Sequence, residues 1–313
     1  MPDTTSIEKA TGTAPVKVGA PLPAPAKGRS LWADAWHDLR RNPLFVISAA
    51  LILFLVVLAL FPSLFTDVNP RDGDPANHYL GRPELTHWFR PDWFGYDGQG
   101  RSIWARVVHG TRASILVGFG VTLLVTLVGG LTGLLAGYFG GWLDSVLSRI
   151  TDIFFGVPFL LGALVVLNAV TDRTPVVVMG ALAFLGWTQM ARVMRGSVLT
   201  TKQADYVTAA RALGAGTWRI MLRHILPNAV APVLVVATIA LGSYISAEAT
   251  LSYLGVGLQD PTVSWGIDIS TASNQVRNAP HVLFFPAGML SLCVLAFMMM
   301  GDAVRDALDP KLR

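Results

Sequence analysis

The chain contains a single cysteine and few charged residues. Charged residues make up 14% of its 313 residues, whereas soluble globular domains carry about 25%, so an ordinary soluble domain is excluded. One cysteine excludes an intrachain disulfide. Cys293 lies within an apolar run, and we interpret it as a packing residue.

The sequence also lacks the motifs that carry catalysis or metal binding. No segment matches Gly-x-x-x-x-Gly-Lys-Ser/Thr, so the chain has no P-loop for nucleotide phosphates. No nucleophile and base are recognisable, and we predict that the chain is not an enzyme and binds no cofactor. His78 and His87 lie in a polar segment without clustered acidic or thiol partners, so we predict no metal site.

Long apolar runs are what the chain has in abundance. Hydrophobic residues make up 52% of it, and a helix needs about 20 apolar residues to cross about 30 Å of hydrocarbon. Six segments qualify: 44–65, 113–138, 150–170, 175–195, 229–254 and 282–302. They predict an all-α polytopic membrane protein with six transmembrane helices. In the second segment Gly129, Gly133 and Gly137 recur every fourth residue, a spacing that favours close helix packing.

Basic residues predict the orientation of these spans, because Lys and Arg gather on the cytoplasmic side. With the N-terminus inside, the inner segments hold sixteen of the 24 basic residues: six before residue 44, then Arg149, six between Arg192 and Arg223, and three after residue 302. The outer segments hold the other eight. Both termini are therefore predicted to be cytoplasmic.

The chain divides into three parts on this view. Residues 1–29 are rich in Pro, Ala, Thr and Gly and are predicted to form a disordered cytoplasmic tail. Residues 30–43 place tryptophans on one helical face, which predicts an amphipathic helix in the membrane interface. Residues 44–313 form the membrane domain, with an outer loop at 66–112 and a cytoplasmic loop at 199–228.

The cytoplasmic loop reads as a helical hairpin. Tyr206, Ala209, Ala210 and Leu213 are spaced by three and four residues, which predicts one apolar face on a short helix that Gly214 ends. A second short helix, about 218–226, is predicted to stop at a proline. So short a hairpin buries little by itself. We expect its face to sit in a groove of another protein; the alternative is an amphipathic connector on the lipid surface.

This loop resembles the cytoplasmic loop of the permeases of ABC importers. The family pattern is Glu-Ala-Ala, three residues, Gly, then Leu-Pro twelve residues later, and Ala209, Ala210, Gly214, Leu226 and Pro227 match it, while Thr208 replaces the glutamate. The resemblance implies contact with a separate ATPase. The residues expected at that contact are Asp205, Tyr206, Ala209, Ala210, Leu213, Gly214, Arg219, Arg223, Leu226 and Pro227.

Four further motifs, in order along the chain, resemble the C-type permease of the peptide/nickel branch of that family. They are Trp32, Ala35, Trp36 and 40–43; the outer-loop motif 94–101, with Gly95, Asp97, Gly100 and Arg101; 248–255 with Pro261 and 264–266; and Gly301–Asp302 with 305–310. Tyr96 and Ser102 replace the Thr and Asp of the outer-loop pattern. The resemblance begins near residue 30 and continues to the end of the chain.

The resemblance implies the type I ABC importer permease fold and the import of dipeptides or oligopeptides. It implies a heterodimer with a B-type permease, two ATPase subunits that hold ATP and Mg, an extracytoplasmic substrate-binding protein and membrane lipid, and no nucleic acid. The expected location is the inner (plasma) membrane of a bacterial or archaeal cell. A nickel importer of the same family remains an alternative.

Two acidic residues lie within apolar runs. A charge at mid-membrane is costly, so Glu248 is expected to face the interior or a water-filled path. The alternative is a snorkelling or protonated residue near the outer end of the span. Asp152 lies near the inner edge of the third segment, where we expect a salt bridge or an interface position. A proton-coupled secondary transporter would use such carboxylates, and it is the alternative function from another class.

Overall fold

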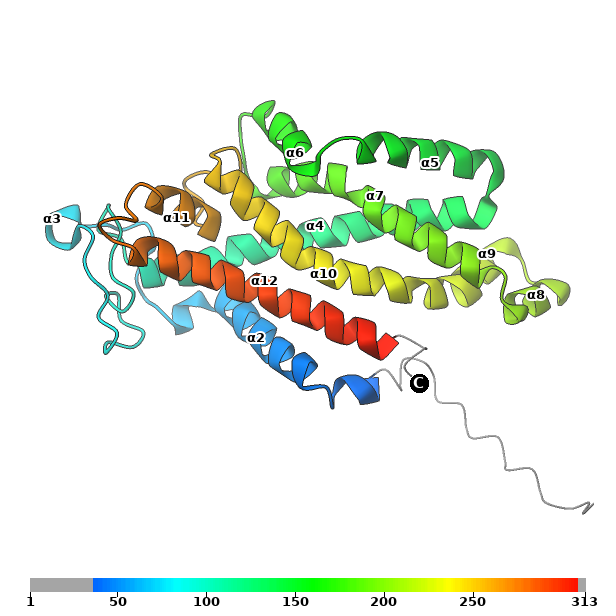
Figure 1. The fold of residues 1–313 in the computed structure, drawn as a ribbon, viewed down its shortest axis with the longest axis horizontal. Helices are drawn as coiled ribbons and strands as arrows, with labels where there is room; N and C mark the ends of the chain where they lie inside the picture. The colour runs from blue at the N-terminus through cyan, green and yellow to red at the C-terminus, as the bar shows by residue number, and fades with distance from the viewer. Residues whose placement is uncertain (1–35, 309–313) are drawn as a thin grey trace, which may run out of the picture.

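The computed structural model describes residues 36–308. Five helices are long and apolar enough to cross a membrane, and they run along the long axis of the bundle (Figure 1). They are α2 (Pro43–Leu60), α4 (Ile103–Phe139), α7 (Pro175–Thr201), α10 (Leu226–Tyr253, continuous with the residues from Thr217) and α12 (His281–Leu308). A sixth crossing is made if the bent pair α5 (Gly141–Phe155) and α6 (Phe159–Asn168) counts as one span. The fold is all-helical, as predicted.

The shorter elements lie mainly at the two ends of this bundle. They are η1 (Pro62–Leu64), α3 (Pro75–His78), α8 (Asp205–Ala212), α9 (Thr217–Arg219), the π-helix η2 (Ile220–Ile225) and α11 (Trp265–Ala272). Figure 1 shows α3 at one end and α8 and α9 at the other. The beginning of α2 and the end of α12 lie towards the α8 end.

Glycines bring α4 and α7 together, as their spacing predicts. A Cβ on Gly129 would lie 2.3 Å from the Trp187 carbonyl oxygen, and one on Gly133 would lie 2.3 Å from that of Ala191. On Gly137 it would lie 2.9 Å from the side chain of Val198. The backbones therefore approach at a distance that only glycine permits, so three successive turns of α4 rest directly on α7.

The second span begins earlier than its apolar run. The side chain of Ser102 caps α4 by accepting from the Ala105 N–H at 3.2 Å, and the helix starts at Ile103. Residues 103–112 of the predicted outer loop are thus helical. Arg106, which lies in this helical segment, is buried and paired with Asp268.

The third predicted span, 150–170, is not one straight helix. α5 and α6 meet at an angle of 84°. Pro158 has no N–H to continue the ladder of α5, and it forms the N-cap of α6 with an extended backbone. The Gly156 N–H closes α5 by bonding to the carbonyls of Asp152 and Ile153. The break between α5 and α6 could not be predicted, because the run is apolar on both sides of it.

The predicted end of the second hairpin helix at Pro227 is wrong. The chain passes from α9 through the π-helix η2 into α10 without leaving a helical path. Pro227 lies in the first turn of α10, directly after the π-helix, so its missing N–H falls where the hydrogen-bond pattern changes from π to α. The hairpin is therefore joined rigidly to a long membrane helix.

The predictions for the N-terminal region fall mostly outside the described residues. The tail 1–29, Trp32 and Ala35 belong to that part of the chain, as do residues 309–313. Residues 36–39 are helical, and the Trp36 ring packs edge-on against Phe45 at 6.1 Å. The Asn42 side chain then caps α2 by accepting from the Leu44 N–H at 2.9 Å.

Candidate functional site

The hairpin of α8 and α9, predicted to be cytoplasmic, forms an exposed apolar edge at one end of the bundle. Leu213 is 88% exposed and Trp218 is 63% exposed, and Tyr206 and Leu222 are also exposed. Partial burial raises the pKa of the Tyr206 phenol. Such large side chains left in contact with solvent mark an interaction surface.

The turn of the hairpin depends on Gly214. Its φ is +80°, and the N–H groups of Gly214 and Ala215 bond to the carbonyls of Arg211 and Ala210, both at 3.0 Å. This is the glycine-ended helix that the sequence predicts. A Cβ on Gly214 would meet nothing within 4 Å, so only the backbone conformation requires glycine here.

Other buried residues hold the hairpin to the bundle. Val207, on the opposite side of α8 from the exposed edge, is fully buried, and it joins Ile220, Met221 and Ile225 in the main hydrophobic core. Sequence reasoning missed this anchor, because a single valine in a short helix carries no periodic signal.

The predicted contact residues of the hairpin fall into two groups by exposure. Asp205, Tyr206, Ala209, Leu213, Gly214, Arg219, Arg223 and Pro227 are exposed, and Ala210 and Leu226 are half-buried. Most of the predicted set is thus available to a partner, with apolar side chains beside two arginines.

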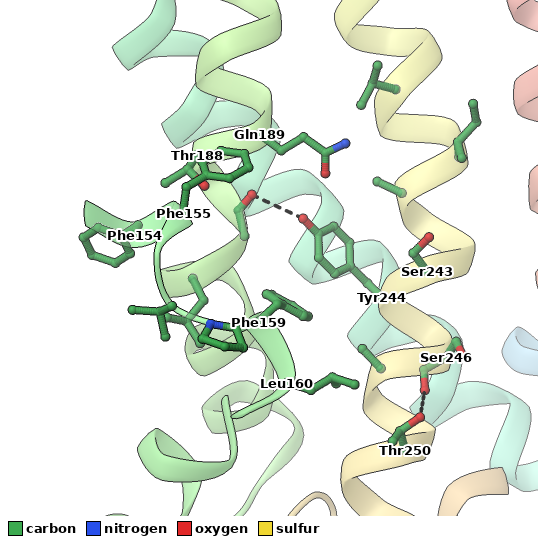
Figure 2. A pocket seen from close by; sticks show the side chains of 18 residues that line it. Phe154, Phe155, Phe159, Leu160, Thr188, Gln189, Ser243, Tyr244, Ser246 and Thr250 are labelled. Carbon is green, nitrogen blue, oxygen red and sulfur yellow. Dashed lines mark hydrogen bonds between the residues drawn. The ribbon is translucent and has the colours of Figure 1, made fainter. Parts of the chain in front are cut away.

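A second feature is a cavity of about 660 Å³ between α7, α10 and the break between α5 and α6. Figure 2 shows side chains converging on it from three sides. Its lining residues are Phe154, Phe155, Val157, Pro158, Phe159, Leu160, Leu185, Gly186, Thr188, Gln189, Val236, Ile239, Ala240, Ser243, Tyr244, Ser246, Ala247 and Thr250. All of these side chains are uncharged, and they combine aromatic walls with hydroxyl groups and one amide.

Tyr244 reaches across this cavity. Its hydroxyl lies 3.4 Å from the Gly186 carbonyl oxygen, and the dashed line in Figure 2 joins α10 to α7 at this point. The ring of Phe159 packs against Tyr244 at 6.0 Å. None of these residues is predicted from the sequence. The three segments are far apart in the chain, and each has the apolar composition of an ordinary transmembrane helix.

Glu248 does not line this cavity. It is fully buried on α10, and its Oε1 accepts from the Ser252 hydroxyl at 2.8 Å. The Ser252 oxygen in turn accepts from the Leu258 N–H at 2.9 Å. Glu248 thus faces the protein interior, as the first expectation has it, and it does not snorkel to the surface.

The outer-loop motif forms a compact turn. The Asp97 carboxylate accepts from the N–H groups of Gln99 and Arg101 at 2.8 and 2.9 Å, and from the Arg101 Nε at 2.7 Å. Gly95 and Gly100 have φ values of +80° and +68°. A Cβ on either would lie 2.5 Å or less from backbone oxygens of the same loop. The four residues therefore shape the loop itself.

Beside this turn lies a buried ion pair that the sequence analysis did not find. Arg106 on α4 and Asp268 on α11 are 162 positions apart, and the Arg106 Nε donates to Asp268 at 2.7 Å. Arg106 also donates to the Pro70 carbonyl oxygen at 3.1 Å. The pair thus ties the outer loop to two helices, and no local pattern could have linked its members.

Two ion pairs fix α5 to α7. Asp152 accepts from Arg192 at 3.0 Å. A salt bridge is one of the two positions that the sequence predicts for this carboxylate. Arg195 binds both carboxylate oxygens of Asp144, at 2.5 and 2.7 Å. These pairs hold one side of the bent α5–α6 pair in place.

The two histidines considered as metal ligands are engaged elsewhere. The His87 Nδ1 lies 2.7 Å from Asp92, and this hydrogen bond lowers the pKa of the Asp92 carboxyl. His78 packs against the Tyr96 ring at 4.4 Å. Within residues 36–308, no group of three or more His, Cys, Asp or Glu side chains is arranged to hold a metal ion.

Two models of known protein families match this chain. A family model described as binding-protein-dependent transport system inner membrane component matches residues 129–313. A second, described as the N-terminal TM domain of oligopeptide transport permease C, matches residues 30–81.

Individual relatives align over nearly the whole chain. The oligopeptide transport system permease protein OppC of Bacillus subtilis (strain 168) is 37% identical over 287 residues, 92% of each chain. The dipeptide transport system permease protein DppC of Alkalihalophilus pseudofirmus is 35% identical over 284 residues, 91% of each. The glutathione transport system permease protein GsiD of Escherichia coli O6:K15:H31 is 36% identical over 293 residues, 94% of this chain and 95% of the relative.

Solved structures share the fold. One of them is the crystal structure of an amino acid ABC transporter with histidines, with a TM-score of 0.50 and 16% sequence identity over 63% of this chain and 91% of that one.

Proposed function

The chain belongs to the binding-protein-dependent transport system inner membrane components, and from this premise we propose that it is the C-type permease subunit of an ATP-driven importer of dipeptides or oligopeptides. Family membership makes it a non-catalytic, multi-pass permease of the inner membrane. The specific substrate, the partners and the roles of individual residues are the proposal.

The observation that carries the coupling role is the exposed apolar edge of the hairpin. Leu213 and Trp218 are exposed to solvent, whereas Val207 on the same hairpin is buried in the bundle. A surface of this kind is stabilised when a partner covers it. In the proposed complex, each of two ATPase subunits binds ATP and Mg, and one of them covers this edge.

The π-helix supports transmission from the hairpin into the bundle. η2 connects the hairpin to α10 without a loop, and α10 carries Tyr244 into the cavity. Motion of the ATPase against the hairpin would therefore be passed to a helix that lines the cavity. The cavity would form this subunit's share of a path completed by a B-type permease, with substrate delivered by an extracytoplasmic binding protein.

The lining of the cavity favours a peptide over a nickel ion. Nickel binds imidazole and other strong donor groups, and the lining contains no His, Cys, Met, Asp or Glu among the described residues. Hydroxyls, one amide and aromatic walls suit a substrate that carries amide groups and apolar side chains. Glu248 lies outside the cavity, so a proton-coupled carriage through it is not favoured either.

The test is assembly and coupling. Co-expressed with a B-type permease and the two ATPases of its operon, the chain should co-purify with them. The assembled complex in proteoliposomes should take up tri-alanine only with ATP and the binding protein. Failure to bind any ATPase, or uptake that continues without ATP, would refute the proposal.

Substitutions in the hairpin test where coupling occurs. Leu213→Asp puts a charge into the expected contact, and Gly214→Val places a β-branched residue at φ +80°, which costs about 1–2 kcal/mol of backbone strain. Each should lower substrate-stimulated ATP hydrolysis at least about tenfold, the effect of about 1.4 kcal/mol, while insertion into the membrane remains normal. Leu213→Met and Gly214→Asn, which keep the apolar contact and tolerate positive φ, are the controls. Full coupling in both disruptive variants would place the docking surface elsewhere.

A further inference from the structure

We propose that Gln189 and Tyr244 form a selectivity point that recognises the amide groups of a peptide as it moves through the cavity. The inference rests on the proposed function and adds to it two residues that choose among substrates. It starts from the contact between α7 and α10 at the middle of the lining (Figure 2).

Tyr244 lies close to Gly186, but the hydrogen bond between the hydroxyl and the carbonyl oxygen is weak. Tyr244 is 6% exposed, and its hydroxyl lies 3.4 Å from the Gly186 carbonyl oxygen, longer than the 2.5–3.0 Å typical of hydroxyl donors. A Cβ on residue 186 would lie 2.6 Å from that hydroxyl. Glycine therefore lets the tyrosine cross the cavity, and the long hydrogen bond is easily exchanged for another.

Gln189 lies about one turn further along α7 and presents an unpaired amide to the same space. Figure 2 shows its side chain extending from α7 towards α10. It lines the cavity, its side chain is exposed, and it makes no side-chain hydrogen bond to any residue in 36–308. An amide offers both a donor and an acceptor, the same pair that a peptide bond presents.

The apolar surroundings of Gln189 and Tyr244 strengthen the hydrogen bonds that these two side chains can make. Phe154, Phe155 and Phe159 come from the break between α5 and α6 and form apolar walls around the cavity. Hydrogen bonds in such surroundings are stronger than in water, and a polar group left unpaired there is costly. Once a substrate has displaced water from the cavity, one whose N–H groups donate to the Gln189 carbonyl oxygen and to the Tyr244 hydroxyl oxygen is therefore favoured over an otherwise similar one that has no amide N–H.

The experiment compares a peptide with its ester analogue. Tri-alanine and the analogue in which ester oxygens replace both peptide N–H groups are delivered by a saturated binding protein to the complete transporter in proteoliposomes. The wild type should take up tri-alanine about tenfold faster than the ester, the change that about 1.4 kcal/mol produces. Gln189→Leu should slow tri-alanine and abolish this preference, and Tyr244→Phe, which removes only the hydroxyl, should reduce it.

Thr238→Val is the matched control. Thr238 lies on α10, the helix that carries Tyr244, but outside the cavity. Its hydroxyl donates to the Leu234 carbonyl oxygen of the same helix at 2.8 Å. The variant should leave both rates unchanged. A preference that survives Gln189→Leu, or equal slowing of both substrates, would overturn the selectivity role while tri-alanine uptake by the wild type upholds the proposed function. Absence of any tri-alanine uptake by an assembled, ATP-hydrolysing wild type would refute both.

Discussion

At the scale of the residue, Glu248 shows how a charge in an apolar helix is accommodated. The Ser252 hydroxyl donates to its Oε1, and the hydroxyls of Ser114 and Ser264 face the same carboxyl group at longer range. Its Oε2 has no hydrogen-bond partner among the described residues. Ser264 also caps α11 by accepting from the Ile267 N–H at 3.4 Å. The cluster therefore joins α4, α10 and α11 near the outer loop.

Replacement of Glu248 tests whether this cluster holds structure or serves transport. Glu248→Leu removes the acceptor of the Ser252 hydroxyl and should lower the free energy of unfolding by about 1–3 kcal/mol, the penalty for unsatisfied buried polar groups. Glu248→Gln keeps an acceptor oxygen and should remain close to the wild type. Thermal unfolding in detergent and complex yield measure the effect, and uptake per assembled complex should be unchanged. Lost uptake by the Gln variant at normal stability would instead assign Glu248 to the path.

At the scale of the element, α4 and α7 approach closely because α4 carries glycines where they meet. The positions of closest approach follow from the four-residue spacing, which returns to the same face of a helix in about one turn. The same packing aligns Arg195 with Asp144 and Arg192 with Asp152, so α5 is held against α7 as well.

Two alanine substitutions separate this packing from the general cost of helical glycine. A Cβ on Gly133 would lie 2.3 Å from the Ala191 carbonyl oxygen, whereas one on Gly196 would meet nothing within 4 Å. Gly133→Ala should lower the thermal midpoint because the backbones must separate. Gly196→Ala should be neutral or stabilise by up to about 1 kcal/mol, as alanine does in an open helical position. Similar midpoints for the two variants would show that α4 and α7 do not pack through Gly133.

At the scale of the whole molecule, the bundle has two different ends. The hairpin, the beginning of α2 and the end of α12 lie towards one end, and the loop with α3 lies at the other (Figure 1). The bias of sixteen basic residues to eight predicts that the hairpin end lies in the cytoplasm. This orientation suits the proposal that ATPases bind at one end and a binding protein at the other.

Cysteine labelling tests that orientation. In a Cys293→Ala background, Gly216→Cys on the hairpin should react with an impermeant maleimide only from the cytoplasmic side, and Ala76→Cys in the outer loop only from outside. Both positions are exposed, so access is set by the membrane. Intact cells and inverted vesicles give the two measurements, and labelling of both positions from the same side would contradict the orientation.

The sequence by itself determined the features that are local or periodic. Apolar runs predicted an all-helical membrane bundle because crossing hydrocarbon requires a minimum length of apolar helix. The spacing of Gly129 and Gly133 predicted a close helix contact, and Gly214 predicted the turn of the hairpin, since each is set by geometry within a few residues.

Only the tertiary structure decided which distant segments meet. The bend at Pro158, the cavity crossed by Tyr244 and the Arg106–Asp268 pair all join segments that the sequence presents separately. The physical reason is that a side chain in an apolar run looks the same whether it faces lipid, a cavity or a neighbouring helix. Its role is set by the packing partner, as for Glu248, whose buried position follows from the helices around it.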